Sequence, residues 1–459
     1  MVLISKMIAP LIDSKYRSHL IIFSAALVLR VIFLIMMAGS IGLSSVADLF
    51  PDSISYIKAG DHLLGTGNEG EFWLFLTGPG YPFFVALFRL VFGGWVLPVL
   101  LVQIILSSLT AVLIYMLSRL IIESRPISFI AGFLAALSIT SIELANCVLS
   151  ETVFLFLFVL SLYLFFRAVI ENRLSFFIAA GILGGAAVLI RSAVLFFPPV
   201  LILLAWLIPL DKSFPGRGKI MKKALLAAVI MAAIPLLWSA RNLSRHDTFI
   251  VSGTGLGAAK TYLAILVNFD IQERPEWEFK KVKDSLYEEA RQEINTANAR
   301  KYYNDARDYV LSTLKKYPRV FIRNYFYTIL DNITAVSALH YYQLPQYSDF
   351  YKSLEIRLYK GTNSYVTLLF SLIGLVVFCR HSRRRAVIPF IIMFYFAIIS
   401  GVTFWQGSRI FYPAIVAQSI LVAATILFLY DLAVLPWRLI RSGRAMSNNG
   451  SAEVESDSV

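Results

Sequence analysis

The chain has 459 residues, of which 58% are hydrophobic and only 15% are charged, and its mean hydropathy is +0.70. This composition excludes an ordinary soluble domain and is typical of a protein with several membrane spans. The net charge of +13 would suggest a nucleic-acid partner in a soluble protein. Here the basic residues gather in short loops on one side of the predicted spans, so we expect no nucleic acid.

Apolar stretches long enough to cross about 30 Å of hydrocarbon recur along the chain. Because these stretches are continuous and not alternating, they predict helices and exclude a barrel. We therefore predict an all-α polytopic membrane protein, a bundle of about ten transmembrane helices. The predicted spans are 20–40, 95–118, 126–144, 149–168, 175–191, 193–210, 222–240, 364–379, 386–405 and 411–431.

The basic loops set the orientation of these spans. Runs such as RHSRRR (380–385) place that side in the cytoplasm, together with both termini. The short apolar segment 79–94 contains Arg89, and counting it as a span would put this basic run outside. It is therefore predicted to be a surface-lying or re-entrant helix. Cys147 and Cys379 then lie on opposite faces, so neither a disulfide nor a metal cluster is expected.

This orientation divides the chain into four parts. Residues 1–240 form a transmembrane core that includes the first exterior loop, 41–94. Residues 241–363 form an exterior helical region, and residues 364–435 form the C-terminal transmembrane helices. Residues 436–459 form a polar cytoplasmic tail.

The first exterior loop contains DLFPDSISYIKAGDHLL, with Asp48, Asp52 and Asp61 near the membrane surface. A helix is predicted from about Asp52 to Leu64, with Asp52 and Tyr56 on the face opposite its apolar stripe. Asp61 falls on that stripe and weakens the pattern. Carboxylates at a membrane surface are costly to bury and invite a functional explanation.

Two acidic residues are the main catalytic candidates. Asp52 after a proline can cap a helix, or it can act as a general base that takes a proton from an attacking hydroxyl group. Glu151 sits one residue inside the apolar run of the fourth span. It can serve the helix dipole after Ser150, or it can hydrogen-bond an acceptor or position Asp52.

Basic residues on the same exterior side are candidates for binding a phosphate. Guanidinium groups match the geometry of phosphate oxygens, and a lipid phosphate leaving group needs cationic stabilisation. Snorkelling to membrane lipids is the alternative for any one of them. The candidates are Arg191, Arg241, Arg409 and Lys260.

The remaining chemistry-bearing residues form no motif. No phosphate-binding loop, zinc-protease motif or nucleophile elbow occurs. His62, His246 and His340 are exterior but scattered along the chain. Nothing in the sequence specifies a metal or another cofactor.

Several segments in the same order resemble the GT-C class of integral-membrane glycosyltransferases. The similarity is to bacterial relatives of protein O-mannosyltransferases and of lipid A aminoarabinose transferases. It covers roughly residues 20–430. The segments are PDSISYIKAGDHLL, GPGYPFFVALFRL, VLSETVFLFLFVLSLYLF, LGGAAVLIRSAVLFFPPVLILL, WSARNLSRHDTFIVSG and GSRIFYPAIVAQSILVAA.

The resemblance implies a sugar donor carried on a polyprenyl phosphate and an inverting transfer at the exterior face. It assigns the catalytic base to Asp52 and the second acidic position to Glu151. Many relatives have an Asp-Glu pair where this chain has Asp52 and Ser53, and Asp48 is the candidate to take part of that role. The phosphate-binding roles fall on Arg191, Arg241 and Arg409, and Tyr56 and Tyr81 are the predicted substrate contacts.

The leading hypothesis is therefore a membrane glycosyltransferase acting on an exterior glycan, lipid or protein acceptor, in the inner membrane of a bacterium with its site facing the periplasm. A transporter or flippase for lipid-linked sugars is the alternative, and it predicts charged or broken helices at the bilayer midplane. Arg30 is the one residue that fits that alternative. A polymerase or ligase of surface polysaccharide is the third hypothesis.

Overall fold

The computed structural model describes residues 16–43, 45, 50–67, 70–208, 216–273, 278, 299–334, 364–381, 383–403 and 409–453. Every regular element in these ranges is a helix. The predicted all-α fold is therefore confirmed. The apolar composition of the helices makes the chain an integral membrane protein.

Long apolar helices form the body of the molecule. Within the described ranges, five are long and apolar enough to cross a membrane. The five are α2 (Arg17–Ile41), α6 (Leu97–Ile122), α9 (Glu151–Glu171), α12 (Arg217–His246) and the stretch Tyr412–Val434, most of which belongs to α22 (Ile415–Glu453). Two shorter helices, α7 (Arg125–Leu137) and α8 (Ile139–Ala145), make a sixth span if they are taken together.

Four shorter apolar helices occupy the other predicted spans. They contain 10 to 18 residues, so the predicted count of ten complete spans is not confirmed by their length. The four are α10 (Leu174–Ile190), α11 (Pro198–Leu207), α20 (Ser364–His381) and α21 (Arg383–Ser400).

The third span is bent by 49° between α7 and α8. Ser138 at the break has an extended backbone. The Arg30 side chain, fully buried on α2, donates hydrogen bonds to the carbonyl oxygens of Ala26 (2.9 Å) and Ala136 (3.0 Å) and to the Ser107 hydroxyl (2.8 Å). Arg30 therefore satisfies a carbonyl at the open end of α7, which a broken helix inside a membrane requires.

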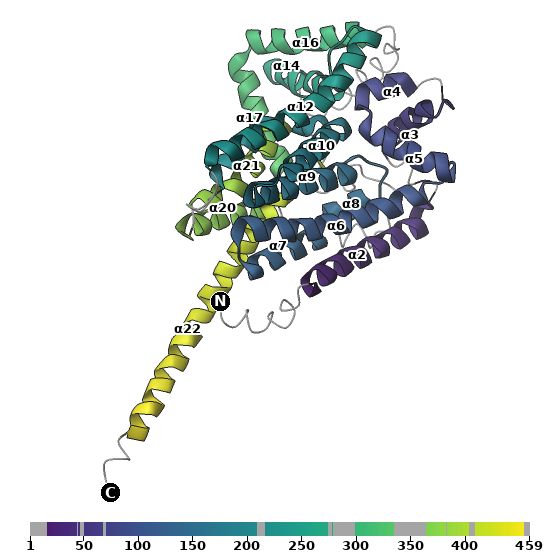
Figure 1. Ribbon diagram of the computed structural model, residues 1–459. Coiled ribbons are helices and arrows are strands. Elements are labelled where there is room, and N and C mark those ends of the chain that lie inside the picture. The colour runs from purple at the N-terminus through teal and green to yellow at the C-terminus, as the bar shows by residue number, and fades with distance from the viewer. Residues whose placement is uncertain are drawn as a thin grey trace.

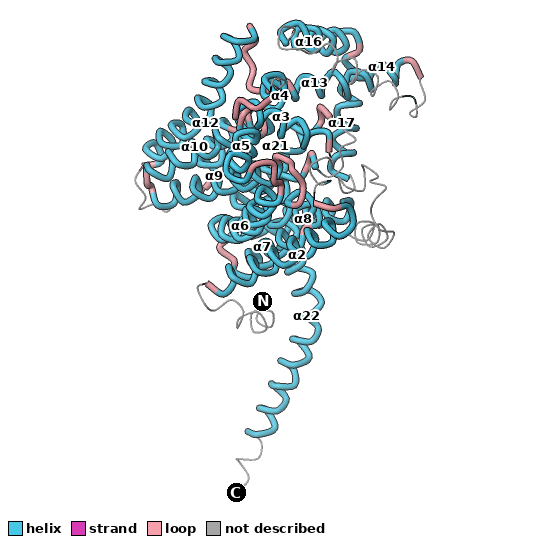
Figure 2. Tube along the Cα trace, turned by 90° about the vertical axis from the view of Figure 1, so that its right-hand side faces the viewer, coloured by secondary structure: helices cyan, strands magenta, loops and turns pink. Residues whose placement is uncertain are grey.

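The helices form one packed bundle. The central helix α9 packs against α6 and α10, α10 packs against α12, and α22 packs against α7 and α20. Figures 1 and 2 both show α4 and α16 at the end of the molecule away from the free end of α22.

The loop that is predicted to be exterior contains three short helices, α3 (Pro51–Leu63), α4 (Gly70–Thr77) and α5 (Gly80–Phe92), of which α3 packs against the other two. The predicted helix is thus confirmed, and it ends where Gly65 takes a φ of +75°, which favours glycine.

The packing of α3 against α5 explains why Asp61 lies on the apolar stripe of α3. Its two carboxylate oxygens accept hydrogen bonds from Arg89 of α5 at 2.6 and 3.1 Å. Arg89 was the charge that argued against a span over 79–94, and α5 has only 13 residues.

The described part of the second predicted exterior region is also helical. The described part contains α13 (Thr254–Ala258), the π-helix η3 (Ala259–Ala264), α14 (Ile265–Ile271), α16 (Ala299–Lys316) and α17 (Pro318–Thr334). α17 packs against α21, which joins this region to the bundle.

Candidate active site

Asp52 lies in the first turn of α3, directly after Pro51. The residue at the N-cap position is Phe50, and it makes no side-chain capping bond, so Asp52 does not cap this helix in the expected way. Its side chain is 42% exposed. The carboxylate is therefore held on a helix yet remains open to a substrate.

Glu151 is the first residue of α9 and is fully buried. It follows a buried turn at 146–150, which the side chain of Gln103 on α6 holds in place. The Nε2 amide of Gln103 donates to the carbonyl oxygens of Cys147 (2.7 Å) and Ala145 (3.4 Å). The position of the Glu151 carboxylate thus depends on an amide from a neighbouring helix.

Arg409 joins these two carboxylates. Its Nη2 donates to Asp52 Oδ2 at 2.5 Å, and its Nε donates to Glu151 Oε1. Arg191, at the end of α10, places its Nη1 2.7 Å from the same Oε1 atom. We call Asp52, Glu151, Arg191 and Arg409 the Asp52 cluster; its four side chains come from four separate parts of the chain.

Two of the four side chains remain open to a ligand. The Asp52 side chain is 42% exposed and that of Arg191 19%, whereas Arg409 is 4% and Glu151 is 0% exposed. Two carboxylates and two guanidinium groups make the cluster neutral. It can therefore accept a proton at its exposed carboxylate and hold an anion at its exposed guanidinium.

Tyr56 borders the Asp52 cluster. Its hydroxyl donates to Ser150 Oγ at 3.0 Å, and Ser150 Oγ also accepts a 3.4 Å bond from Arg191. Burial, followed by the nearby charges of Asp52 and Glu151, raises the pKa of Tyr56 to about 12. Tyr56 therefore stays a neutral hydroxyl at physiological pH.

Tyr81 lies behind Tyr56, with their ring centroids 4.7 Å apart in an edge-to-face arrangement. It is fully buried, and its hydroxyl donates to Gln103 Oε1 at 2.6 Å. Through Gln103 it supports the turn before Glu151. A direct contact between Tyr81 and substrate, which the sequence predicted, would need this side chain to become exposed.

Arg241 lies in a different group from Arg191 and Arg409. Its Nη2 donates to Glu71 Oε1 at 2.5 Å, and its guanidinium stacks on Trp238 at 4.6 Å. His246 Nε2 lies 2.9 Å from the same Glu71 oxygen, and His62 Nε2 lies 3.0 Å from Oε2. We call Glu71, Arg241, His246 and His62 the Glu71 cluster.

Two features of the Glu71 cluster correct the sequence analysis. His62 and His246 are not scattered, because they meet on one carboxylate. Glu71 itself was missed, and the only signal for it was an acidic residue beside the apolar stretch FWLFL in the first exterior loop. Asp52 and His62 are ten residues apart on α3, so roughly 15 Å of helix separates the two clusters.

The charge state of Glu71 follows from its partners. Burial raises its pKa, but the charge and hydrogen bond of Arg241, with the hydrogen bonds of His246 and His62, outweigh that effect and lower the pKa below its ordinary value. Glu71 is therefore an anion that holds three basic groups together.

Asp48 and Lys260 are the two remaining candidates. Asp48 falls outside the described residues. Lys260 lies on η3, which packs against α16. Their roles remain predictions.

Over the described part of the chain, no group of three or more His, Cys, Asp or Glu side chains is arranged to hold a metal ion. A pocket of about 300 Å³ lies elsewhere, between α20 and α22, and five of its six lining residues are apolar. That pocket lacks a carboxylate and does not include either cluster.

Residues 77–238 match the family described as dolichyl-phosphate-mannose-protein mannosyltransferase. The match covers about a third of the chain and confirms the predicted resemblance to GT-C membrane glycosyltransferases. It includes Glu151 and Arg191, and Asp52, Arg241 and Arg409 lie outside it. No curated protein matches the chain.

Two solved structures of the Archaeoglobus fulgidus oligosaccharyltransferase are similar to the chain. The first, AglB with an inhibitory peptide and a dolichol-phosphate, has a TM-score of 0.49 and 14% identity, covering 94% of this chain and 52% of that one. The second, tethered to an acceptor peptide with the NVT sequon, has a TM-score of 0.48 and 15% identity, covering 92% and 50%. The chain thus spans about half the length of these proteins.

Proposed function

We propose that this chain is a membrane glycosyltransferase that moves a sugar from a polyprenyl-phosphate donor to an acceptor outside the cytoplasm. The Asp52 cluster carries the proposal, because it sets a partly exposed carboxylate beside guanidinium groups at one end of a membrane bundle. We place the protein in a bacterial inner membrane, with this end facing the periplasm.

The proposed reaction is a single displacement. Asp52 takes the proton from the acceptor hydroxyl or amine as the acceptor atom bonds to the anomeric carbon of the sugar. The bond from that carbon to the lipid phosphate breaks, and the phosphate leaves with the electron pair. Attack on the face opposite the departing phosphate inverts the configuration.

The charge balance of the Asp52 cluster suits this step. The cluster is neutral before the reaction, and it gains one net positive charge when Asp52 takes the proton. That charge appears as the lipid phosphate leaves as an anion, so the cluster stabilises the leaving group when stabilisation is needed. Arg191 is the better contact for this phosphate, because it is more exposed than Arg409.

The different burial of Asp52 and Glu151 assigns different roles to these two carboxylates. Glu151 is fully buried and bonded to two guanidinium groups, so it cannot reach a substrate proton. We assign it to positioning Arg191 and Arg409, and through Arg409 it also fixes Asp52. Arg241 and Lys260 remain candidates for binding the donor phosphate, and Asp48 remains a candidate to share the role of the base. Tyr56 and Tyr81 remain candidates for substrate contacts.

Replacing Asp52→Asn tests the proposed base. A general base contributes roughly 10²- to 10⁴-fold, so we expect sugar transfer to fall at least about 100-fold. The assay uses the purified chain with dolichyl-phosphate mannose as the first donor probe, and mass spectrometry of the products.

Asp61→Asn is the matched control, because Asp61 lies on the same helix and pairs with Arg89 outside the Asp52 cluster. This variant should keep its transfer activity. Full activity of the Asp52 variant, with protein present in the membrane, would refute the assignment of the base.

A transporter or flippase for lipid-linked sugars is the second candidate, and the bend between α7 and α8 favours it. The Arg30 charge at that bend is bonded to backbone carbonyls and a serine of the bundle. Reconstitution in vesicles separates the candidates, since an enzyme forms a new glycosidic bond and a flippase moves lipid without chemistry. A polysaccharide polymerase or ligase would form that bond on a glycan acceptor.

A further inference from the structure

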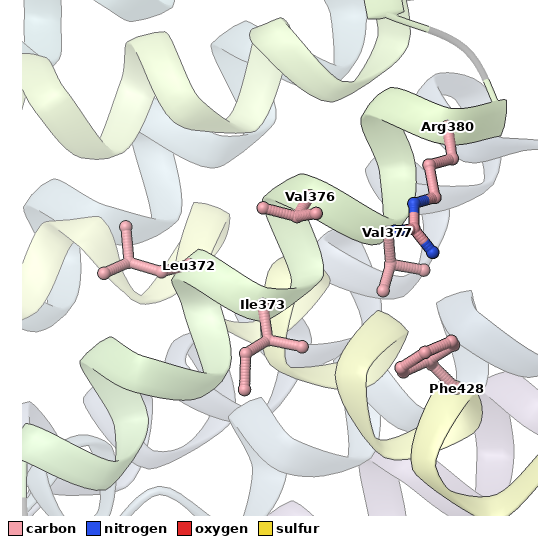
Figure 3. A pocket seen from close by; sticks show the side chains of 6 residues that line it. All are labelled: Leu372, Ile373, Val376, Val377, Arg380 and Phe428. Carbon is pink, nitrogen blue, oxygen red and sulfur yellow. The ribbon is translucent and has the colours of Figure 1, made fainter. Parts of the chain in front are cut away.

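The pocket between α20 and α22 has two kinds of lining. Leu372, Ile373, Val376 and Val377 of α20 and Phe428 of α22 supply an apolar wall, and Arg380 is the sixth lining residue. Figure 3 shows these side chains around the pocket, with the guanidinium of Arg380 extending toward the side of Phe428.

The pocket opens toward the surroundings of the bundle. Leu372 and Val376 are 46% and 57% exposed, and Arg380 is exposed as well. These three residues are spaced by four, so they form one stripe along the outer face of α20. In a membrane-spanning bundle, such a stripe faces lipid.

A close contact explains why the helices enclose a space here. Gly374 packs against the Leu421 carbonyl of α22, where a Cβ atom would clash, and the Thr425 hydroxyl donates to the Phe370 carbonyl at 2.5 Å. Small residues allow membrane helices to approach closely. The pocket lies beside this contact, where α20 continues toward Arg380.

The guanidinium group of Arg380 is available to bind an anion. It makes no ion pair or hydrogen bond with any residue in the described ranges. It also lies at the basic end of α20, before a run of arginines at 383–385 that marks the cytoplasmic side. The pocket is far from the Asp52 cluster, because the 18 residues of α21 span about 27 Å between the two ends.

We propose that this pocket binds an anionic phospholipid of the cytoplasmic leaflet. One acyl chain lies along Leu372 and Val376 and reaches Phe428, and the lipid phosphate pairs with Arg380. Leu372 and Arg380 are eight residues apart, about 12 Å along the helix, so headgroup and chain contacts fit one lipid molecule. Basic pockets between membrane helices bind anionic headgroups in this way.

Lipid retention by the purified full chain tests the proposal. The chain is stripped of lipid in detergent, supplied with phosphatidylglycerol or phosphatidylcholine, and examined by native mass spectrometry. We expect one phosphatidylglycerol to be retained preferentially. Arg380→Gln should weaken its binding about fivefold, the loss expected for one arginine near a headgroup.

Two further variants separate a built pocket from general attraction to basic loops. Val376→Trp fills the pocket and leaves every charge in place, so it should also lower phosphatidylglycerol binding. Arg217→Gln removes an exposed arginine at the start of α12, on the same predicted face and outside the pocket lining, and should leave binding unchanged.

Several outcomes would overturn the proposal. Equal binding of the two lipids, or unchanged binding after Arg380→Gln, would remove the role of the charge. If Arg380→Gln lowered phosphatidylglycerol binding and Val376→Trp did not, the lipid would be attracted by the charge of Arg380 without occupying the pocket. Displacement of the lipid by millimolar inorganic phosphate would indicate a site for the free anion.

Discussion

Glu151 holds two guanidinium groups in a fully buried position, and its Oε2 atom has no hydrogen-bond partner among the described residues. Removing one member of a buried ion pair leaves the others without compensation, which costs about 3–5 kcal/mol. Glu151→Gln should therefore lower the free energy of unfolding by about 3 kcal/mol, measured by unfolding in detergent.

Glu171→Gln is the control for this prediction. Glu171 ends the same helix and pairs with Arg167 at a partly exposed site, where such a pair contributes about 0.5 kcal/mol. If Glu151→Gln unfolded as the wild type does, the Asp52 cluster would not be holding its four segments together.

Glu71 gives the fold a dependence on pH. Because its pKa in the folded state lies below the ordinary value of 4.5, the carboxylate stabilises the fold fully above that value. This stabilisation is lost as the pH falls through the folded-state pKa. The difference in unfolding midpoint between wild type and Glu71→Gln should be present at about pH 6 and should shrink as the pH falls below 4.5 and through the folded-state pKa.

The comparison with Glu71→Gln isolates this carboxylate from the other acids of the chain, which titrate in both proteins. A difference in midpoint that stays constant over the same pH range would contradict the ionic role of Glu71. It would leave only a packing role for the residue.

The first exterior unit depends on a close contact between α5 and α10. A Cβ atom at Gly80 would lie 2.6 Å from the backbone nitrogen and Cγ1 of Ile190, the residue before Arg191. Gly80→Ala should therefore push α5 away, displace Arg191 and lower the free energy of unfolding by roughly 1–3 kcal/mol. Sugar transfer should fall with it.

Gly94→Ala is the matched control, because a Cβ atom at Gly94 would meet nothing within 4 Å. Its effect on unfolding should stay within about 0.5 kcal/mol. Equal behaviour of the two variants would mean that α5 is free to shift without disturbing α10.

Local sequence signals such as proline and glycine predicted the positions of helices better than they predicted bends within them. Pro51 and Gly65 bound a helix that the sequence identified nearly to the residue. The bend between α7 and α8 was not predicted, because the apolar residues continue across Ser138 and neither Pro nor Gly marks it. The distant Arg30 bonds to the carbonyl oxygen of Ala136 at the end of α7.

At the scale of the whole molecule, sidedness made part of the candidate site predictable. Charge asymmetry put Asp52, Glu151, Arg191 and Arg409 at one membrane face, and the structure brings them together. Charge asymmetry could not predict that Arg241 would pair with Glu71, which is 170 residues away in the sequence. Both arginine groups lie on the predicted exterior side, and they differ in the carboxylates that they bind.

This sidedness can be measured on intact cells. A single cysteine at Asp247, whose side chain is 75% exposed at the end of α12, should react with a membrane-impermeant maleimide. A cysteine at Arg217, at the start of the same helix, should react only after permeabilisation. Cys147 and Cys379 are replaced beforehand. The reverse pattern would put the Asp52 cluster in the cytoplasm and refute the proposed donor side.

The link from Arg409 to Asp52 joins residues 357 positions apart. During synthesis, Asp52 and Glu151 leave the ribosome long before the arginine that ties them together. A nascent chain therefore carries an unfinished centre until its last apolar helices insert. A chain released before residue 409 would lack the guanidinium that joins Asp52 to Glu151.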